Sequence, residues 1–147
     1  METRIIKLLS DFTEPITRKK FSHFLFTYLH PFGDPIEEIE KCIDYALLDN
    51  SKAGGFIIAV FEDEKIIGGL VANKTGMSGY IPENIIVYVA VDAQMRGKGI
   101  GKMMIDLAIE LCDGDVKLHV EYDNPAKRLY ERIGFKNKYA DMRFKKG

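Results

Sequence analysis

The feature that most constrains this chain is a run of alternating glycines that separates two apolar patterns of different period. Gly97, Gly99 and Gly101 follow the segment Ile85–Val91, which has almost no polar residue. After the glycines, apolar residues recur at the helical period of 3.6: Ile100, Met103, Met104, Leu107, Ala108 and Leu111. The pattern predicts a central strand covered on both faces, then a tight turn, then an amphipathic helix.

The same run predicts a binding site for an anion. The first N–H groups of a helix lack intrahelical partners, and the helix dipole places positive charge beside them. Glycines let a ligand approach this backbone, and Arg96, Lys98 and Lys102 add charge at the same place. The spacing GxGxG does not fit the GxGxxG loop of dinucleotide-binding folds, and Met103 after Lys102 does not fit a P-loop. We therefore expect a pyrophosphate to bind here.

The N-terminal third of the chain is predicted to contain a strand and two helices. Arg4–Leu9 is rich in strand formers, and Phe21–Leu29 has helical spacing up to a break at His30–Gly33. The second helix is expected to begin with Asp34 as its N-cap and with Glu37 closing a capping box. Its apolar face would consist of Ile36, Ile39, Ile43, Ala46 and Leu47.

The middle of the chain has the period of β-strands. Phe56–Phe61 and Ile66–Ala72 are predicted to form a hairpin around the turn Glu62–Lys65, and the polar segment Lys74–Pro82 is predicted to be a loop.

The C-terminal third is predicted to alternate strands with a short helix. Val116–Glu121 alternates as a strand, and a helix is expected from Asn124-Pro125 to Gly134. Phe135 and Met142–Phe144 would lie in two short closing strands. The whole order predicts an α+β fold with a single mixed, mostly antiparallel central sheet and helices on both faces.

Charge and cysteine content narrow the class of protein. The net charge of −1 over 147 residues argues against binding of the whole chain to nucleic acid or to an anionic membrane, so the basic segments Arg18–Lys20 and Lys145–Lys146 are interpreted as solvated faces. No apolar run approaches the roughly 18–20 residues of a membrane span. Cys42 and Cys112 form no CxxC pair, and the histidines form no ligand cluster, so we expect buried thiols and no metal. One domain over residues 1–147 in a reducing cytoplasm is expected.

Two segments resemble the signatures of the GNAT superfamily of N-acetyltransferases. Gln94-Met95-Arg96-Gly97-Lys98-Gly99 is similar to the superfamily's Q/R-x-x-G-x-G/A motif. Downstream, the run from Asn124 to Phe135 is similar to its N…A…LY…GF motif. Both motifs occur in the right order and at the right separation. The resemblance implies the acyl-CoA N-acyltransferase fold and acetyl-CoA as cosubstrate.

The resemblance also implies roles for individual residues. The backbone of Val89, Ala90 and Val91 would bind the pantetheine arm like an added strand, and one N–H there would polarise the thioester carbonyl. Tyr130 would lie near the sulfur and protonate the departing CoA thiolate, which suits a phenol if the site lowers its pKa. Asn124 would contact pantetheine, although the spacing from the tyrosine also allows Asp123. The pyrophosphate would be held by Arg96, Gly97, Lys98, Gly99, Ile100, Gly101 and Lys102.

The general base is left open by the sequence. In related enzymes a glutamate precedes an inward valine on the strand after the long helix, and His119 before Val120 occupies that place here. A histidine near its usual pKa could take a proton from an ammonium group. Glu83 and Glu121 are alternatives, and so is a water relay, because acetyl transfer to an amine can rely on proximity.

These features predict an N-acetyltransferase that passes the acetyl group of acetyl-CoA directly to a primary amine of a small molecule or peptide in a ternary complex. The alternative is an acyl-CoA-binding sensor or scaffold without turnover. Specificity for the amine is expected in Phe21–Phe32 and in Lys74–Pro82. Glu37, Glu38 and Glu40 are expected to face solvent. The oligomeric state stays open, with a homodimer as one option.

Overall fold

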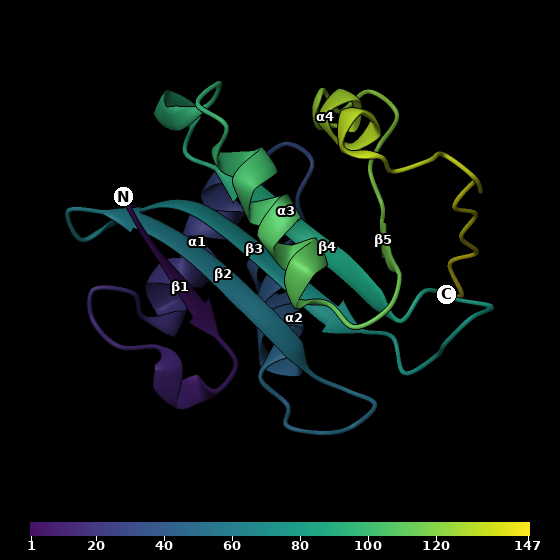
Figure 1. Cartoon of the computed structure of the whole chain (residues 1–147), viewed down its shortest axis with the longest axis horizontal. Coiled ribbons are helices and arrows are strands. Elements are labelled where there is room, and N and C mark those ends of the chain that lie inside the picture. The colour runs from purple at the N-terminus through teal and green to yellow at the C-terminus, as the bar shows by residue number, and fades with distance from the viewer.

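One five-stranded sheet runs through the computed structural model, which describes residues 1–147 (Figure 1). The strand order is β1-β2-β3-β4-β5, antiparallel from β1 to β4 and parallel between β4 and β5. The strands are β1 (Glu2–Ile6), β2 (Gly55–Glu62), β3 (Lys65–Lys74), β4 (Asn84–Val91) and β5 (Val116–Leu118). The helices are α1 (Arg18–Leu29), α2 (Ile36–Ala46), α3 (Ile100–Leu111) and α4 (Ala126–Ile133), with 3-10 turns at Leu9–Asp11 and Ala93–Met95. The predicted α+β class with one mixed, mostly antiparallel sheet is confirmed.

The sheet separates two apolar layers, because successive side chains of a strand point to opposite faces. On β2, Ile57 packs with α1 and α2, whereas Ile58 packs with α3. Figure 1 shows α3 in front of the sheet and α1 and α2 behind it. The helix side chains with no exposed surface are Phe21, Leu25, Ile39, Ile43 and Ala46 in the first layer and Met104, Ile105 and Ala108 in the second. Helices on both faces were expected from the sequence.

β4 contains one residue more than the stretch of β3 with which it pairs. Val71 pairs with Tyr88 and Ala72 pairs with Ile86, so Val87 has no partner on β3. The extra residue is a β-bulge, and it turns the side chains of Val87 and Tyr88 to the same face, toward α1 and α2. The parallel ladder between β4 and β5 ends beside the bulge, at Ile86. Beyond this point the second edge of β4 has no partner strand.

The C-terminal part of the sheet is smaller than predicted. The strand expected over Val116–Glu121 stops at Leu118, because the ladder to β4 ends at the bulge. The closing strands expected at Phe135 and Met142–Phe144 are wrong, since no strand follows α4. The side chains of Met142 and Phe144 are 90% and 91% exposed. Met142 and Phe144 are separated by Arg143 and flanked by charged residues, so this short segment buries too little surface to hold a strand in place.

The first strand also differs from its predicted bounds. It covers Glu2–Ile6 instead of Arg4–Leu9. The carboxylate of Asp11 accepts the N–H groups of Lys7 and Leu8 at 2.9 and 3.0 Å, and this removes both groups from the ladder.

The start of α2 is built differently from the predicted capping box. Pro35 is the N-cap residue, and no side chain caps the helix. The Asp34 carboxylate instead accepts a hydrogen bond from the Tyr88 hydroxyl on β4, with 2.5 Å between the oxygens. A contact between residues so far apart in the sequence therefore replaces the local one.

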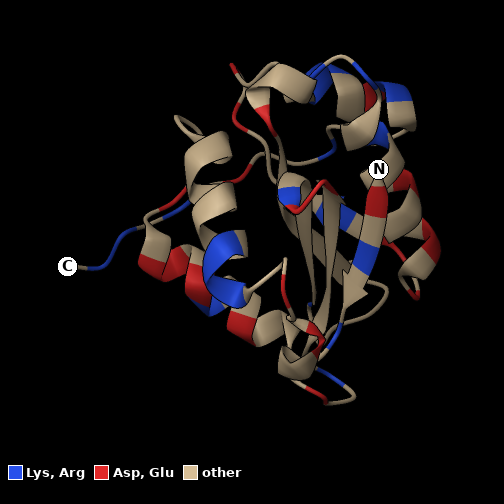
Figure 2. Cartoon of the chain, turned by 90° about the vertical axis from the view of Figure 1, so that its left-hand side faces the viewer, with Lys and Arg blue, Asp and Glu red and all other residues tan.

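Charged side chains of both signs are interspersed over the helices and loops, whereas the central strands carry few of them (Figure 2). Within the basic segment at the start of α1, Arg18 bonds to Glu40 and Asp44 at 2.9 Å, and Lys20 bonds to Glu14 at 2.7 Å. None of the helices has the length and apolar character needed to cross a membrane.

Candidate active site

The glycine loop leads into α3 with two residues in the left-handed region. Gly97 has φ 80° and Gly99 has φ 83°. A Cβ atom at either residue would meet no other atom within 4 Å, so the backbone conformation, and not lack of space, requires glycine. Gly99 is the N-cap of α3 and has no side chain to satisfy the first turn. The first intrahelical bond runs from the Met103 N–H to the Gly99 carbonyl, which leaves the preceding helical N–H groups available to a ligand.

Asp92 anchors the loop on the other side. Its side chain is almost completely buried, with 1% of the residue exposed. Oδ1 accepts the Gln94 N–H at 2.9 Å and so caps the 3-10 turn, while Oδ2 lies 3.2 Å from the Lys65 ammonium. The Gln94 N–H and the Lys65 charge hold the pKa of Asp92 below its usual value. The carboxylate therefore fixes the direction in which the chain leaves β4.

The three cations of the loop have different surroundings. Arg96 donates to the carbonyls of Val91 and Tyr28, at 3.2 Å each, and so ties the loop to the end of α1. Lys102 forms an ion pair of 2.6 Å with Asp106 one turn later in α3. Lys98 is exposed, and its ammonium lies 3.8 Å from the Met95 sulfur. Lys98 is therefore the cation least engaged by other groups.

The second edge of β4 leads directly to this loop. The Asp92 N–H donates to the Ile67 carbonyl on β3 at 2.9 Å. Because backbone groups alternate between the two edges of a strand, those of Ala90 also face β3, and those of Val89 and Val91 face the open edge. The Val91 carbonyl agrees with this alternation, since it accepts a side-chain hydrogen bond from outside the sheet.

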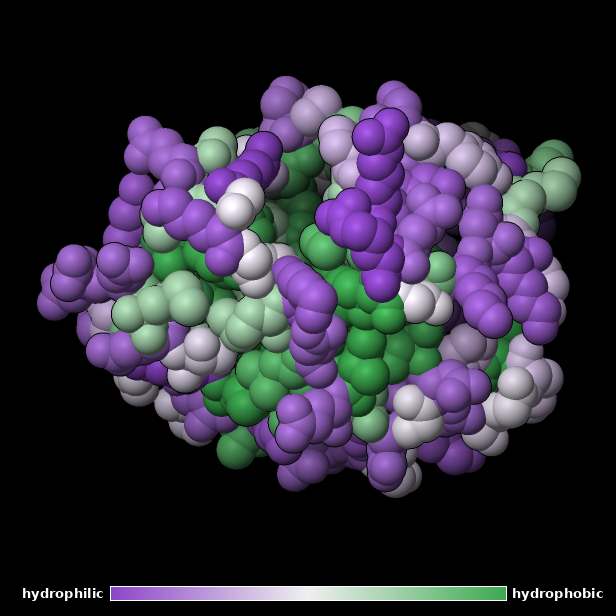
Figure 3. Space-filling model, turned by 45° about the horizontal axis from the view of Figure 1, so that its top comes forward, coloured by the Kyte–Doolittle hydropathy of each residue, from purple (hydrophilic) through white to green (hydrophobic).

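Helix α4 packs beside the start of α3. An added Cβ at Gly101 would lie 3.5 Å from Leu129 of α4 and 3.8 Å from Val91 of β4, so the three elements meet at this glycine. At the start of α4, Asn124 Oδ1 accepts the Ala126 N–H at 3.0 Å, as the capping pattern predicted. The surface that carries α3 and α4 has an apolar hollow bordered by hydrophilic side chains (Figure 3).

Tyr130 lies on α4 with its ring against the apolar layer of α3. The ring meets Phe135 edge to face, with 6.2 Å between the centroids. Burial raises the pKa of the Tyr130 hydroxyl above its usual value. The sequence hypothesis required a site that lowers this pKa, and the surroundings do the opposite. The phenol is therefore protonated at neutral pH, as a proton donor must be.

The candidate bases are in different situations. Glu83 accepts the N–H groups of Asp115 at 2.7 Å and Gly79 at 2.9 Å, which lowers its pKa and commits it to a structural role. His119 follows β5, with Nδ1 3.4 Å from Arg143 Nη2 and 3.7 Å from Asp141 Oδ2. Partial burial lowers the pKa of His119, the charges of Lys117 and Arg143 act in the same direction, and Asp141 opposes them. The imidazole is therefore neutral at pH 7 and can accept a proton. The side chain of Glu121 is exposed.

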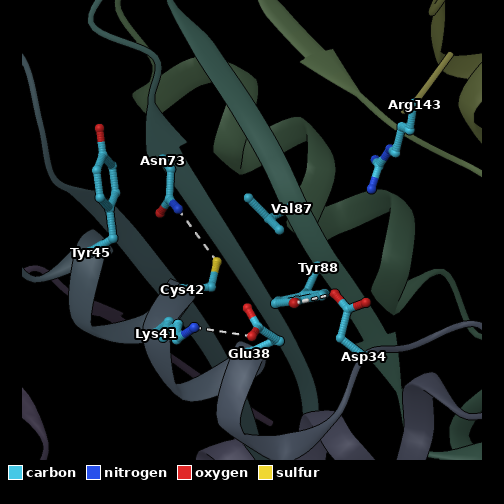
Figure 4. A pocket seen from close by; sticks show the side chains of 9 residues that line it. All are labelled: Asp34, Glu38, Lys41, Cys42, Tyr45, Asn73, Val87, Tyr88 and Arg143. Atoms are coloured by element: carbon cyan, nitrogen blue, oxygen red, sulfur yellow. Dashed lines mark hydrogen bonds and ion pairs between the residues drawn. The ribbon is translucent and has the colours of Figure 1, made fainter. Parts of the chain in front are cut away.

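A cavity of about 440 Å³ lies between α2 and the bulged part of β4 (Figure 4). Asp34 and Glu38 contribute carboxylates, and Val87 and Tyr88 form the wall on β4. Asn73 of β3 also lines the cavity, and its Oδ1 is buried with no hydrogen-bond partner.

Sequence reasoning missed this cavity. Glu38 was expected to face solvent, and specificity was assigned to other segments. The position of the cavity depends on the β-bulge at Val87, and no sequence pattern predicts this bulge. The hydroxyl of Tyr88 within the apolar run Ile85–Val91 is the one hint that a polar partner lies beside the strand.

The profile of the Acetyltransferase (GNAT) family matches residues 16–135. This match includes the glycine loop, the open strand edge and α4. The chain belongs to the GNAT family.

Relatives of this GNAT chain fall into two groups. A cysteine-rich protein 2-binding protein of Mus musculus is 44% identical over 55 residues, which are 37% of this chain and 7% of the mouse protein; the Homo sapiens protein gives the same values. The chain thus spans only a small part of the length of these relatives. Among solved structures, a ribosomal-protein-alanine N-acetyltransferase from Brucella melitensis biovar Abortus 2308 has a TM-score of 0.65 at 18% identity, covering 100% of this chain and 99% of that one. The aminoglycoside N-acetyltransferase AAC(6')-Iy, in complex with CoA, has a TM-score of 0.69 at 14% identity, covering 99% and 95%. These likenesses establish the acyl-CoA N-acyltransferase fold.

The two cysteines of the GNAT chain lie in apolar surroundings. Cys42 packs against the α1–α2 layer and Cys112 against the α3 layer. Burial raises the pKa of Cys42 to about 12 and that of Cys112 to about 11. Both thiols are therefore poor nucleophiles at neutral pH.

Proposed function

We propose that residues 1–147 act as one cytoplasmic N-acetyltransferase domain, which transfers the acetyl group of acetyl-CoA to a primary amine of a small molecule or peptide in a ternary complex. The observation that carries the proposal is the continuity between the open edge of β4 and the uncapped start of α3. A strand edge can bind an extended amide chain, and a helix N-terminus can bind a pyrophosphate. CoA has both parts, joined in that order.

The residues present fit this cosubstrate. Val89 and Val91 offer backbone groups to the pantetheine amides. The side-chain oxygen of Asn124 caps α4, and its side-chain N–H groups would donate to pantetheine. Ala90 would make no hydrogen bond to pantetheine and would only hold Val89 and Val91 in place, because its own backbone groups face β3. The pyrophosphate would be held by the N–H groups of the loop and first helical turn and by its cations: Arg96, Gly97, Lys98, Gly99, Ile100, Gly101 and Lys102.

Acetyl-CoA supplies an activated acyl group as a thioester. The amine nitrogen attacks the carbonyl carbon and the C–S bond breaks. No enzyme-bound acyl group is formed, since both thiols are protonated and partly buried. His119 takes the proton that the amine loses, directly or through water, because its lowered pKa keeps it neutral. Tyr130 gives a proton to the departing thiolate.

Release of CoA thiol with a panel of amines tests the proposal. We expect turnover with at least one amine, and Tyr130→Phe should lower kcat by about 10²-fold or more without weakening CoA binding, as expected for loss of a general acid. Tyr122→Phe is the matched control, because Tyr122 is 74% exposed.

A sensor or scaffold would give a different pattern. CoA would bind, and no amine would release thiol in either the unchanged chain or Tyr130→Phe. Such a result would refute the enzyme assignment and favour the alternative.

A further inference from the structure

The cavity beside β4 has polar groups at two levels along the strand. At one level the Tyr88 hydroxyl donates to Asp34. At the other level lies Asn73, which pairs in register with Ile85. Along β3 the two levels are two residues apart, because Tyr88 pairs with Val71 and Val87 is the extra residue of the bulge. Two residues correspond to about 7 Å at the usual rise of 3.3 Å per residue.

Each level can accept hydrogen bonds from a ligand. At the first level, Asp34 uses one carboxylate oxygen for Tyr88, and the second oxygen has no hydrogen-bond partner within the chain. At the other level, Asn73 Nδ2 donates to the Cys42 sulfur at 3.4 Å, which directs the amide and leaves Oδ1 buried without a donor. A buried acceptor without a donor is unfavourable, so a ligand N–H group would satisfy it. Figure 4 shows Glu38 beside Tyr88, at the first level, and Cys42 and Val87 between the two levels.

The cations near the cavity are already paired. Lys41 lies 3.1 Å from Glu38, and Arg143 lies 2.8 Å from Asp141. Both basic side chains are mostly exposed. The carboxylate of Asp34 and the amide oxygen of Asn73 therefore remain for a guest, and both favour a donor of positive charge.

Between the two levels the walls are largely apolar. Val87 of the bulge and the neutral thiol of Cys42 face the cavity there. Such walls suit methylene groups and offer no partners to the many hydroxyls of a sugar. The pattern is one hydrogen-bonding level, an apolar span and a second hydrogen-bonding level.

We propose that the acceptor is a small aliphatic diamine or polyamine, which reacts at the Asp34–Tyr88 level and places its second ammonium group against Asn73. This inference rests on the proposed acetyl transfer. The reacting level is the one at the bulge, where the second edge of β4 opens. Arg143 connects the same cavity to His119, with 3.4 Å between the side chains.

Turnover of amines of graded length tests the inference. For each chain length, kcat/KM is measured for the α,ω-diamine and for the monoamine that lacks the second nitrogen. We expect the diamine to be preferred by about 10-fold or more at an optimal length, as for a charge-assisted hydrogen bond to a buried group. Asn73→Leu should reduce this preference while monoamine turnover is retained. Glu37→Gln is the control for a polar substitution outside the cavity, since Glu37 is exposed and does not line the cavity.

The outcomes separate this inference from the proposed function. Equal kcat/KM for diamines and monoamines, or an undiminished preference in Asn73→Leu, would overturn the inference and leave acetyl transfer intact. If CoA binds but no amine is acetylated, the proposed function fails, and calorimetric titration of the diamine into the CoA complex decides the rest. Binding that is lost in Asn73→Leu supports the cavity assignment, and absence of binding refutes it.

Discussion

His119 is held between groups of opposite charge at the end of β5. Arg143 and Asp141 approach the imidazole from the C-terminal tail, and Lys117 lies on the same strand. Partial burial is the largest influence and lowers the pKa of His119, the charge of Lys117 acts in the same direction, and Asp141 opposes them. Because a base must be deprotonated to act, the lowered pKa widens the pH range in which His119 can serve.

The pH profile of kcat/KM should show this shift. We expect an acid limb below the usual histidine value of about 6.5. Lys117→Met should move the limb to higher pH, since it removes a charge that disfavours the imidazolium. His119→Asn should lower kcat/KM by about 10²-fold or more and abolish the limb. A limb that persists in His119→Asn would mean that the amine itself or a water relay sets it.

In the turn into α3, backbone conformation and packing place different demands on the three glycines. Gly97 and Gly99 have left-handed backbone conformations. A side chain at either position would have room, but its Cβ would make this backbone conformation unfavourable. Gly101 lies within α3, where a Cβ would make ordinary contacts with Leu129 and Val91. The three glycines are therefore not equivalent.

Alanine at two of these positions separates the demands. Gly99→Ala should lower the free energy of unfolding by about 1–2 kcal/mol, the cost of a left-handed residue with a Cβ, and should weaken CoA binding by distorting the first helical turn. Gly101→Ala should cost less, because alanine favours helix over glycine. Denaturant unfolding and calorimetry with CoA measure both effects. Equal losses for the two variants would contradict this account.

Elements with local signals could be predicted from the sequence, and contacts made by folding could not. Helical periodicity defined α3 to the residue, and Asn124-Pro125 marked the start of α4. Asp34 had the local features of a helix cap, yet its carboxylate accepts a hydrogen bond from Tyr88 on β4 instead of capping α2. For the same reason the glycine loop was recognised as a candidate binding site, whereas the cavity beside Tyr88 was not.

The molecule as a whole depends on one sheet shared by two apolar layers. Leu25 lies in the layer of α1 and α2, Met104 lies in the layer of α3, and neither has any exposed surface. Adjacent residues of β2 point into different layers. Loss of packing on one face should therefore weaken the other face as well.

Cavity-forming variants test this coupling. Leu25→Ala and Met104→Ala should each lower the free energy of unfolding by about 2–5 kcal/mol, and each should keep a single transition. Urea unfolding followed by far-UV and near-UV circular dichroism measures both. Separate transitions in either variant would show that the layers unfold independently, against a single domain over residues 1–147.

The bulge at Val87 places two neighbouring residues of β4, Val87 and Tyr88, on the same face of the sheet. Without Val87 the alternation is regular, because Ile86 and Val89 face α3 while Tyr88 and Ala90 face α1 and α2. Deleting Val87 would therefore remove the bulge and the valine wall of the cavity and leave every other side chain on its own face, whereas deleting Val89 would move one half of the strand to the opposite face. The Lys74–Pro82 loop next to it can change length without such an exchange, because it has no two-residue repeat to preserve. Single-residue deletions should accordingly be tolerated in that loop and, with loss of the cavity wall, at Val87, and they should be rejected at Val89, where strand length determines which side of the sheet each group faces.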